Sequence, residues 1–231
     1  MEKINLTDFQ KRKFSNCFIA VYVVSKDIKI RTDTCLTNKK IYIIFGLDIM
    51  GSRQILGIYF DNENDTRFWL EKFEDFQARH LKDILFFITI PNKNIERAGK
   101  MKVALKDLFL AQDYEKYKIN FELFKSVYVD NSLILIMLDK MQKEIDTFYQ
   151  YSHQLRMLFY PFYTIHEMKK FLNKLKTKEP LCTNINEVIE FCLPYINSFE
   201  FGRNFSKKDW LDLICFLYYE YNDKLEEYLN G

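Results

Sequence analysis

The pattern of apolar runs and turns is clearest in Lys40–Phe87, KIYIIFGLDIMGSRQILGIYFDNENDTRFWLEKFEDFQARHLKDILFF. Its apolar runs are Ile41–Leu47, Ile55–Phe60 and Ile84–Ile90, and the amphipathic segment Asp65–Arg79 lies between the last two. Short apolar runs rich in β-branched and aromatic residues are typical of strands, whereas Asp65–Arg79 has its aromatic residues on one side of a helix. This order predicts a hairpin, a crossover helix and a returning strand, which is the opening of an α/β domain.

The residues before this stretch extend the predicted sheet. Cys17–Val24 is a continuous apolar run that predicts a buried strand, and Ile28–Arg31 alternates apolar with basic residues. Together with the hairpin they predict a three-stranded antiparallel meander, in which Gly51 supplies the turn between the last two strands. We expect Ile84–Ile90 to return as a central strand. Residues 1–16 are polar and predict a lead-in with one short helical turn.

The second half of the chain is expected to be mostly helical. The expected helices are Asn94–Leu110, Met141–Phe159, Ile165–Lys176, Asn184–Phe191 and Lys207–Leu229, and the expected strands are Phe121–Val129 and Leu133–Leu138. Asn184 and Glu187 have the spacing of a capping box, in which two side chains satisfy free backbone N–H groups at the start of a helix.

Composition narrows the class of protein. The 231 residues suit one sizeable domain or a core with an appendage. Because 34 basic residues are balanced by 32 acidic ones, any contact with nucleic acid must rest on a local patch. No signal peptide or membrane span is expected from the pattern of apolar residues. The cysteines lack metal-type spacing, so we expect reduced thiols and a cytoplasmic location; they are Cys17, Cys35, Cys182, Cys192 and Cys215.

An ordered set of short motifs extends through the opening stretch. In chain order they are Ile28-Lys29-Ile30-Arg31, Asn38-Lys39, Tyr42, Gly46-Leu47-Asp48, Gly51, Gln54-Ile55-Leu56-Gly57, Glu63, Trp69 and Arg79. At ungapped spacing this set resembles the catalytic domain of Mutator-type bacterial transposases, in which a glycine follows the arginine at the position of Arg79. The resemblance implies a ribonuclease-H-like core. It also implies descent from enzymes that recombine the DNA of mobile elements. Two shorter matches follow, His153-Gln154-Leu155-Arg156 and Thr183-Asn184-Ile185-Asn186-Glu187.

The resemblance also implies a division of the chain. Residues 1–98 are expected to form the ribonuclease-H-like core, residues 99–182 a divergent and mostly helical insertion, and residues 183–231 the C-terminal helices that complete the core. The family's large helical insertion is expected to be mostly deleted and its N-terminal DNA-binding region to be missing. The chain therefore resembles a degenerate, truncated form of the transposase catalytic domain.

The three catalytic carboxylates of the family are the decisive comparison. The resemblance places the first at Val24, counted back from Arg31, the second at Ile90, counted forward from Arg79, and the third at Glu187. Strand transfer by this fold requires two divalent cations, and Mg²⁺ or Mn²⁺ requires oxygen ligands, which valine and isoleucine lack. We therefore expect a pseudoenzyme with no catalytic residue and no cofactor. Once the metal is gone, an apolar side chain at a buried strand position avoids the desolvation of a carboxylate.

Simpler interpretations stand beside the functional ones for the remaining polar residues. Glu187 is expected to cap its helix, His153 to make a structural hydrogen bond, and His80 and His166 to lie at the surface. The acidic residues near the hairpin are expected to be solvated turn and loop residues rather than a substitute cluster; they are Asp48, Asp61, Glu63 and Asp65.

A run of lysines lies on the predicted helix Ile165–Lys176, opposite its apolar face. Its members are Lys169, Lys170, Lys174 and Lys176. A solvated helix face is the simpler interpretation, and contact with a nucleic-acid backbone is the functional one.

Three hypotheses about function stay open. In the first, an inactive transposase-derived protein serves as a binding or regulatory module that contacts a related transposase or a second copy of itself, with DNA as the weaker alternative and no membrane partner. In the second, an active metal-dependent transposase or nuclease uses Mg²⁺ or Mn²⁺ with displaced carboxylates, Asp27 or Asp48 together with Glu187. Asp27 lies three residues beyond Val24, which predicts the opposite strand face or the following turn. In the third, the chain is a fossil fragment with no selected activity.

Overall fold

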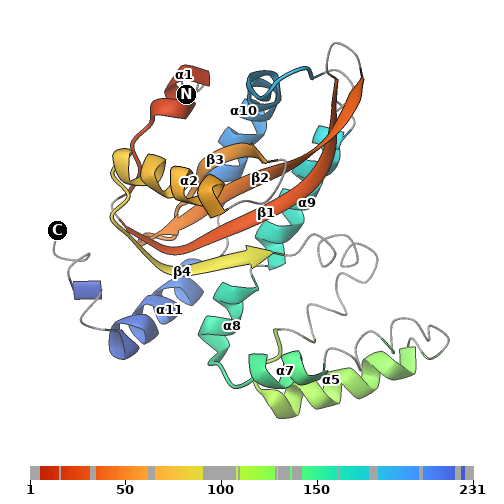
Figure 1. Ribbon diagram of the computed structural model, residues 1–231. Helices are drawn as coiled ribbons and strands as arrows, with labels where there is room; N and C mark the ends of the chain where they lie inside the picture. The colour runs from red at the N-terminus through yellow and green to blue at the C-terminus, as the bar shows by residue number, and fades with distance from the viewer. Residues whose placement is uncertain are drawn as a thin grey trace.

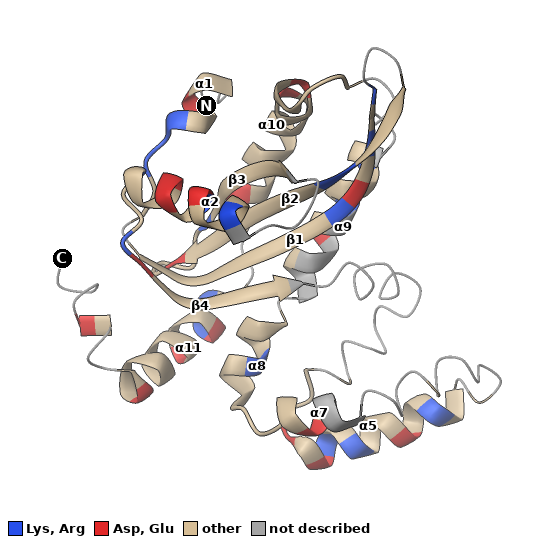
Figure 2. Ribbon diagram, in the orientation of Figure 1, with Lys and Arg blue, Asp and Glu red and all other residues tan. Residues whose placement is uncertain are grey.

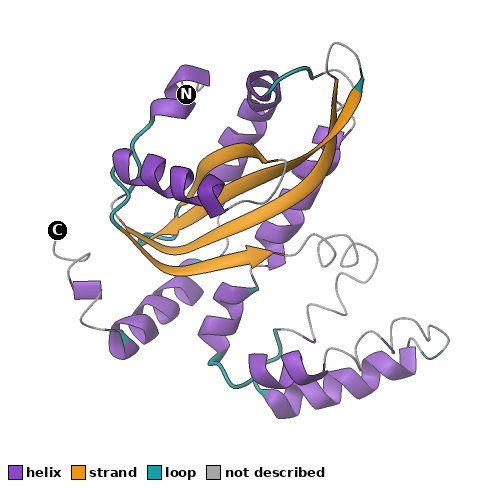
Figure 3. Ribbon diagram, viewed as in Figure 1, coloured by secondary structure: helices purple, strands orange, loops and turns teal. Residues whose placement is uncertain are grey.

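The computed structural model describes residues 6–15, 17–31, 35–61, 66–90, 108, 110–127, 129, 136, 142–160, 162–176, 182–202, 205–221 and 225–226. The strands are β1 (Cys17–Arg31), β2 (Leu36–Asp48), β3 (Arg53–Asp61) and β4 (Asp83–Ile90). The helices are α1 (Leu6–Lys11), α2 (Thr66–Ala78), α5 (Tyr114–Val127), α7 (Gln142–Phe148), α8 (His153–Phe159), α9 (Phe162–Lys176), α10 (Ile185–Phe201) and α11 (Lys207–Glu220). Figure 3 shows the strands gathered into one sheet with helices around it.

The four strands form a mixed sheet in the order β3-β2-β1-β4. The pairs β1–β2 and β2–β3 are antiparallel, and β4 returns parallel to β1 after the crossover helix α2. The predicted α/β class, the meander and the crossover are therefore confirmed. Two details of the prediction are wrong. β1 continues without a break to Arg31, so Val24 lies within a strand and not at its end, and β4 lies at the edge of the sheet formed by the described strands.

Helices cover both faces of the sheet (Figure 1). On one face α2 packs over a cluster that includes Phe18, Val23 and Phe76. On the other face α8, α9, α10 and α11 pack over the larger apolar cluster, to which β1 contributes Tyr22 and Val24. The alternation of side chains along β1 explains this division, since successive residues of a strand point to opposite faces. β1 is therefore the buried centre of the domain.

Edge strand β3 is covered at its bulge by charged side chains. The Ile55 N–H donates to Glu200 Oε1 on α10 at 2.7 Å, and Arg12 donates to the Ile55 carbonyl oxygen. Arg12 Nη1 also donates to Glu200 Oε2 at 3.0 Å, so one ion pair fixes both the lead-in and α10 to this edge. Such cover removes backbone groups that would otherwise be open to pairing with another chain.

The second half of the chain differs from its prediction in several places. The predicted strand at Phe121–Val129 is wrong, because Phe121 and Phe124 lie on the buried side of helix α5 together with Tyr117. The helix predicted at Met141–Phe159 is two helices, α7 and α8, separated by a turn that ends at Ser152, the N-cap of α8. The last helix, α11, ends earlier than predicted. The predictions Asn94–Leu110 and Leu133–Leu138 lie almost entirely outside the described residues.

Helices α5 and α7 extend away from the sheet and are joined to it through α8, and we call this pair of helices the helical arm (Figure 1). Basic and acidic residues are interspersed along α2 and α5, in agreement with the small net charge of the chain (Figure 2). Among the described residues no helix is both long enough and apolar enough to cross a membrane.

Candidate functional site

Val24 and Ile90 are neighbours across the sheet. The parallel pairing of β1 with β4 runs from Cys17 opposite Asp83 to Val24 opposite Ile90. Adjacent strands lie about 4.8 Å apart, so side chains on one face at these two positions could share a ligand. The sequence motifs therefore identify two positions that the fold does bring together.

Val24 is packed in the larger apolar cluster. Its side chain is 0% exposed and lies on the sheet face that the C-terminal helices cover. Tyr22, its neighbour on the same face, is fully buried and donates a hydrogen bond from its hydroxyl to the Leu158 carbonyl oxygen on α8 at 2.6 Å. Burial raises the pKa of the Tyr22 hydroxyl. Position 24 is therefore a dry position within the core.

The next inward-facing residue of β1 is a lysine. Lys26 is 8% exposed, and its Nζ lies 3.4 Å from Oδ1 of Asn173 on α9. Asp27 is exposed on the other face of the strand, as its offset from Val24 predicts. The charged side chain nearest to Val24 along its own face of β1 is thus a cation, and a cation does not bind a metal ion.

Glu187 caps α10. Its carboxylate accepts hydrogen bonds from the Thr183 N–H at 2.6 Å, from the Thr183 hydroxyl at 2.7 Å and from Asn184 Nδ2 at 3.0 Å. In return the Glu187 N–H donates to Asn184 Oδ1 at 3.1 Å, and Asn184 is the N-cap residue. These hydrogen bonds, first of all the one from the Thr183 backbone, lower the pKa of Glu187. The predicted capping role is confirmed.

Glu187 does not approach the other two family positions. The Arg31 N–H donates to the Cys182 carbonyl oxygen at 3.1 Å, which places the start of α10 at the far end of β1. Arg31 is seven residues beyond Val24, so these two strand positions are separated by about 23 Å at the usual rise of a strand. Asn184 also lines a groove with Ile58 of β3, on the edge of the sheet opposite β4.

The other acidic candidates are similarly dispersed. Asp48 is opposite Phe18 at the beginning of β1, and its Oδ1 accepts hydrogen bonds from Met50 N and Ser52 N in the β2–β3 turn. Burial raises the pKa of Asp48, although those two hydrogen bonds oppose the shift. The side chains of Asp61, Glu63 and Asp65 lie outside the described part of the structure.

The three family positions do not fit a pair of divalent cations. Val24 provides no oxygen, and the Glu187 carboxylate is engaged in capping at a distant point of the sheet. Among the described residues no group of three or more His, Cys, Asp and Glu side chains is arranged to hold a metal ion.

The histidines take structural or surface positions where they are described. His80 is exposed, as predicted, and its φ of 78° lies in the left-handed region at the end of α2, where the motif has glycine. His153 is half-buried, and burial together with the nearby Arg156 lowers its pKa. His153 Nδ1 has no partner among the described residues, whereas a hydrogen bond with the Ala111 backbone opposes the lowering of the His153 pKa and agrees with the predicted structural role. The side chain of His166 is not among those described.

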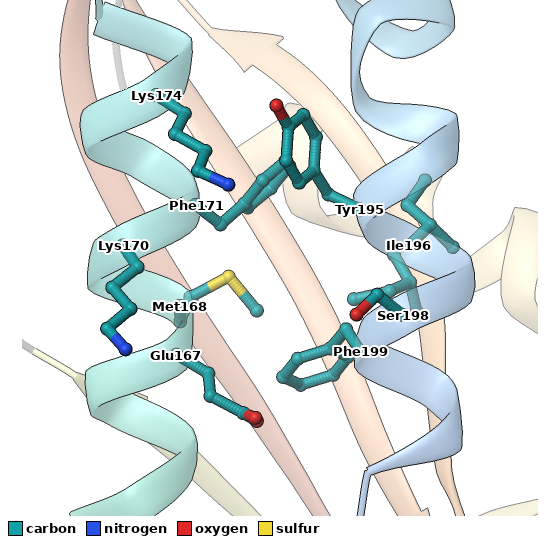
Figure 4. A pocket seen from close by; sticks show the side chains of 10 residues that line it. Glu167, Met168, Lys170, Phe171, Lys174, Tyr195, Ile196, Ser198 and Phe199 are labelled. Atoms are coloured by element: carbon teal, nitrogen blue, oxygen red, sulfur yellow. The ribbon is translucent and has the colours of Figure 1, made fainter.

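Two of the four predicted lysines line a groove between α9 and α10. Lys170 and Lys174 are exposed and contribute to this groove, whose volume is about 200 Å³ (Figure 4). The side chains of Lys169 and Lys176 lie outside the description. Sequence reasoning missed the α10 wall of the groove, which consists of Tyr195, Ile196, Ser198 and Phe199, because no local pattern pairs two helices.

Several residues of the ordered motif set make structural contacts. The Trp69 ring on α2 packs edge-on against Tyr42 of β2 with centroids 5.2 Å apart. Arg79 donates from Nη1 to the Leu56 carbonyl oxygen at 3.1 Å and from Nε to that of Arg12 at 3.0 Å. A Cβ at Gly46 would lie 2.3 Å from the Phe18 ring, so only glycine fits there. These residues maintain the sheet whether or not any chemistry is performed.

Comparison with known proteins agrees with these motifs. Residues 2–99 match the family described as Transposase, Mutator family. This part of the chain is similar to the Mutator transposases. The match includes all four strands and both Val24 and Ile90, whereas α8 to α11 and Glu187 lie beyond it.

Two curated transposases are similar to the same degree. A probable transposase for an ISRM3-like insertion sequence element from Sinorhizobium fredii (strain NBRC 101917 / NGR234) is 26% identical over 81 residues. The transposase for insertion sequence element ISRM3 from Rhizobium meliloti (strain 1021) is 27% identical over 81 residues. Each alignment covers 35% of this chain and 20% of the relative. The chain thus matches about a fifth of the length of these two curated relatives.

Proposed function

We propose that this chain is a transposase-derived protein that has lost metal-dependent catalysis and acts as a binding or regulatory module. The observation that carries the proposal is the burial of Val24, opposite Ile90, at the two adjacent positions where the family motif has its first two carboxylates. Losing one metal-binding carboxylate removes orders of magnitude in rate, and losing two leaves no means of holding a pair of cations.

We propose further that the sheet is a ribonuclease-H-like core. An antiparallel meander, a crossover helix and a strand returning parallel to the first support this assignment. In this proposal residues 1–98 provide the sheet, residues 99–182 form the helical insertion that contains the helical arm, and residues 183–231 supply the helices that complete the core. α8 and α9 join the core from the end of the insertion.

The partner in this proposal is a related transposase or a second copy of the chain. The net charge of +2 and the mixed charges on the helices favour protein contacts over autonomous binding to DNA. A cytoplasmic setting would keep the five cysteines as thiols, and none of them forms a disulfide in the structure. Light scattering should detect a dimer. In an electrophoretic mobility shift assay at physiological ionic strength, the chain should cause little salt-dependent change in the mobility of DNA.

The alternative is an active nuclease with displaced carboxylates. It requires Asp27 or Asp48 to act with Glu187, yet Asp27 is on the exposed face of β1, and Asp48 and Glu187 are at opposite ends of that strand. A fossil fragment without selected activity is the remaining alternative, and it predicts no partner of any kind.

Calorimetric titration with MnCl₂ and MgCl₂, together with a plasmid-nicking assay, tests the loss of catalysis. We expect no saturable metal binding and no nicking, with the Glu187→Gln variant behaving like the parent chain. Asp27→Asn and Asp48→Asn are the matched controls for the displaced-carboxylate alternative. Saturable binding of two ions that either substitution removes would overturn the proposal.

A further inference from the structure

The groove between α9 and α10 has an apolar floor. Met168 and Phe171 of α9 and Ile196 and Phe199 of α10 line it, and Ile55 of β3 lies below them. Figure 4 shows the two helices side by side with their four apolar side chains, Met168, Phe171, Ile196 and Phe199, between them. A volume of about 200 Å³ is smaller than a typical small-molecule pocket and suits one or two apolar side chains of a partner.

The rim of the groove carries a net positive charge. Lys170 and Lys174 are on the α9 side, and the third charged residue of the lining, Glu167, forms an ion pair with Arg53. Arg53 is buried, with its side chain 2% exposed and its guanidinium 4.8 Å from the centroid of the Phe199 ring, so Glu167 is already neutralised. The two lysines therefore present positive charge beside an apolar floor.

We propose that this groove binds an acidic amphipathic helix of a partner protein. In this mode an apolar anchor of the partner packs over Phe171 and Phe199, which are each 9% exposed, and two of its carboxylates meet Lys170 and Lys174. These lysines are four residues apart on α9, about 6 Å along the helix axis, and carboxylates at i and i+4 on a partner helix have the same spacing. Recognition of an amphipathic helix in an apolar groove is a common mode of peptide binding.

The surroundings of Tyr195 favour a peptide over a nucleic acid. The Lys174 Nζ lies 4.6 Å from the centroid of the Tyr195 ring, and the rings of Phe171 and Phe191 are centred 5.6 Å and 5.7 Å from it. With three neighbours packed around the ring, base stacking at Tyr195 would require their displacement. The apolar floor would also add no binding free energy for a phosphate backbone, because a phosphate backbone binds through charge.

This inference rests on the proposed function in one respect, that the chain acts by binding a partner. The site itself does not depend on whether catalysis has been lost. Saturable metal binding would therefore overturn the proposed function but not the inference about the groove. Conversely, if the chain dimerises and binds no metal but its groove binds no peptide, only the inference about the groove would be overturned.

Fluorescence anisotropy with a labelled synthetic peptide tests the groove on the full chain. The probe is a capped peptide of about four helical turns, with leucine and phenylalanine four residues apart and glutamates at i and i+4 beside them. The matched control peptide has glutamine in place of each glutamate. We expect the glutamate peptide to bind saturably, the glutamine peptide to bind at least about tenfold more weakly, and added salt to weaken the first far more than the second.

Three variants locate the binding. Lys170→Glu with Lys174→Glu should weaken the glutamate peptide at least about tenfold by like-charge repulsion. Ser198→Trp should abolish binding by filling the groove from an exposed position, with thermal unfolding unchanged. Lys82→Glu with Lys116→Glu makes the same charge change at exposed lysines outside the groove and should have no effect. The inference would be overturned if the peptide did not bind, or if the groove variants left its binding unchanged. It would also be overturned if a single-stranded oligonucleotide bound to the chain and Lys170→Glu removed that binding.

Discussion

A side chain at position 24 lies on the buried face of the central strand, so its chemistry decides whether this part of the core is dry. Aspartate there is tolerable only when cations and water balance its charge, because an unpaired carboxylate in an apolar environment is strongly destabilised. Valine requires neither and packs against the C-terminal helices. The apolar residue at this position is therefore compatible with a stable core in a way that a carboxylate without its metal is not.

The variant Val24→Asp should be destabilised by at least about 3 kcal/mol at neutral pH, since it places a charge in the apolar core. Burial would raise the folded-state pKa of the new carboxyl above its unfolded value, so the variant should be most stable below pH about 4 and lose stability as pH rises through the raised pKa. Lys26, with Asn173 beside it, is the cation on the same face and would offset part of this loss. Chemical denaturation across pH measures the effect.

The control Val24→Asn has nearly the same shape as the aspartate variant and a polar side chain, but it carries no charge and does not titrate. It should be destabilised to an extent that is independent of pH between the acid and neutral ranges. An aspartate variant as stable as the parent at neutral pH, or one whose loss does not vary with pH, would contradict the picture of a dry core at this position.

At the scale of elements, periodicity predicts what is local and fails where packing decides. The hairpin and α2 follow from their apolar spacing and from Gly51, whose φ of 75° is a conformation that glycine adopts readily. A strand is predicted at Phe121–Val129, yet Phe121 and Phe124 together with Tyr117 form one face of α5. The sequence predicts β4 at the centre of the sheet, whereas its place at the edge of the described strands depends on long-range pairing.

Hydrogen bonds at the start of α10 make the stability of this helix depend on pH. Hydrogen bonds from Thr183 and Asn184 hold the folded-state pKa of Glu187 below its ordinary value. The capping contribution should thus be complete above the unfolded pKa of about 4.3 and should be lost as pH falls through the lowered folded-state pKa. In Glu187→Gln this acid-sensitive component should disappear, so its melting temperature should fall less steeply on acidification than that of the parent.

Thermal unfolding followed by circular dichroism over the acid range measures that difference. Glu190→Gln removes a carboxylate from the exposed side of the same helix and should leave the acid dependence as it is in the parent. If both variants show the same acid dependence as the parent, the carboxylate of Glu187 does not stabilise the helix start.

In the whole molecule, some features of the candidate site can be predicted from the sequence, and others depend on how distant segments pack together. Counting along the motifs identified Val24 and Ile90, and their adjacency follows once β4 returns parallel to β1. The spacing of Asn184 and Glu187 predicts the capping role of Glu187 correctly, but the distance of Glu187 from Val24 depends on where α10 crosses the sheet. The groove could not be predicted at all, because α9 and α10 have separate local patterns and meet only in the folded chain.

The helical arm is attached to the rest of the fold through α8, and Arg156 of α8 makes the main contacts of this attachment. This side chain is 2% exposed, donates from Nη1 to the Ala111 carbonyl oxygen at 2.8 Å and from Nη2 to that of Gln112 at 2.6 Å, and lies 4.2 Å from the Tyr149 ring centroid. Burial lowers the pKa of Arg156, which nevertheless stays charged at neutral pH. A charged fork bonded to two consecutive carbonyl groups fixes the segment that enters α5.

Arg156→Met keeps the length of the side chain and removes both hydrogen bonds, each worth about 1.5–3 kcal/mol for a charged donor. We expect amide hydrogen exchange in α5 and α7 to accelerate by at least about tenfold, because the arm can open without unfolding the sheet, while exchange in β1 and β2 stays at the parent rate. Arg156→Lys restores the charge without the planar fork and should recover only part of the protection. Equal acceleration in the arm and in the two strands would instead mean that Arg156 supports the sheet and the arm as one cooperative unit.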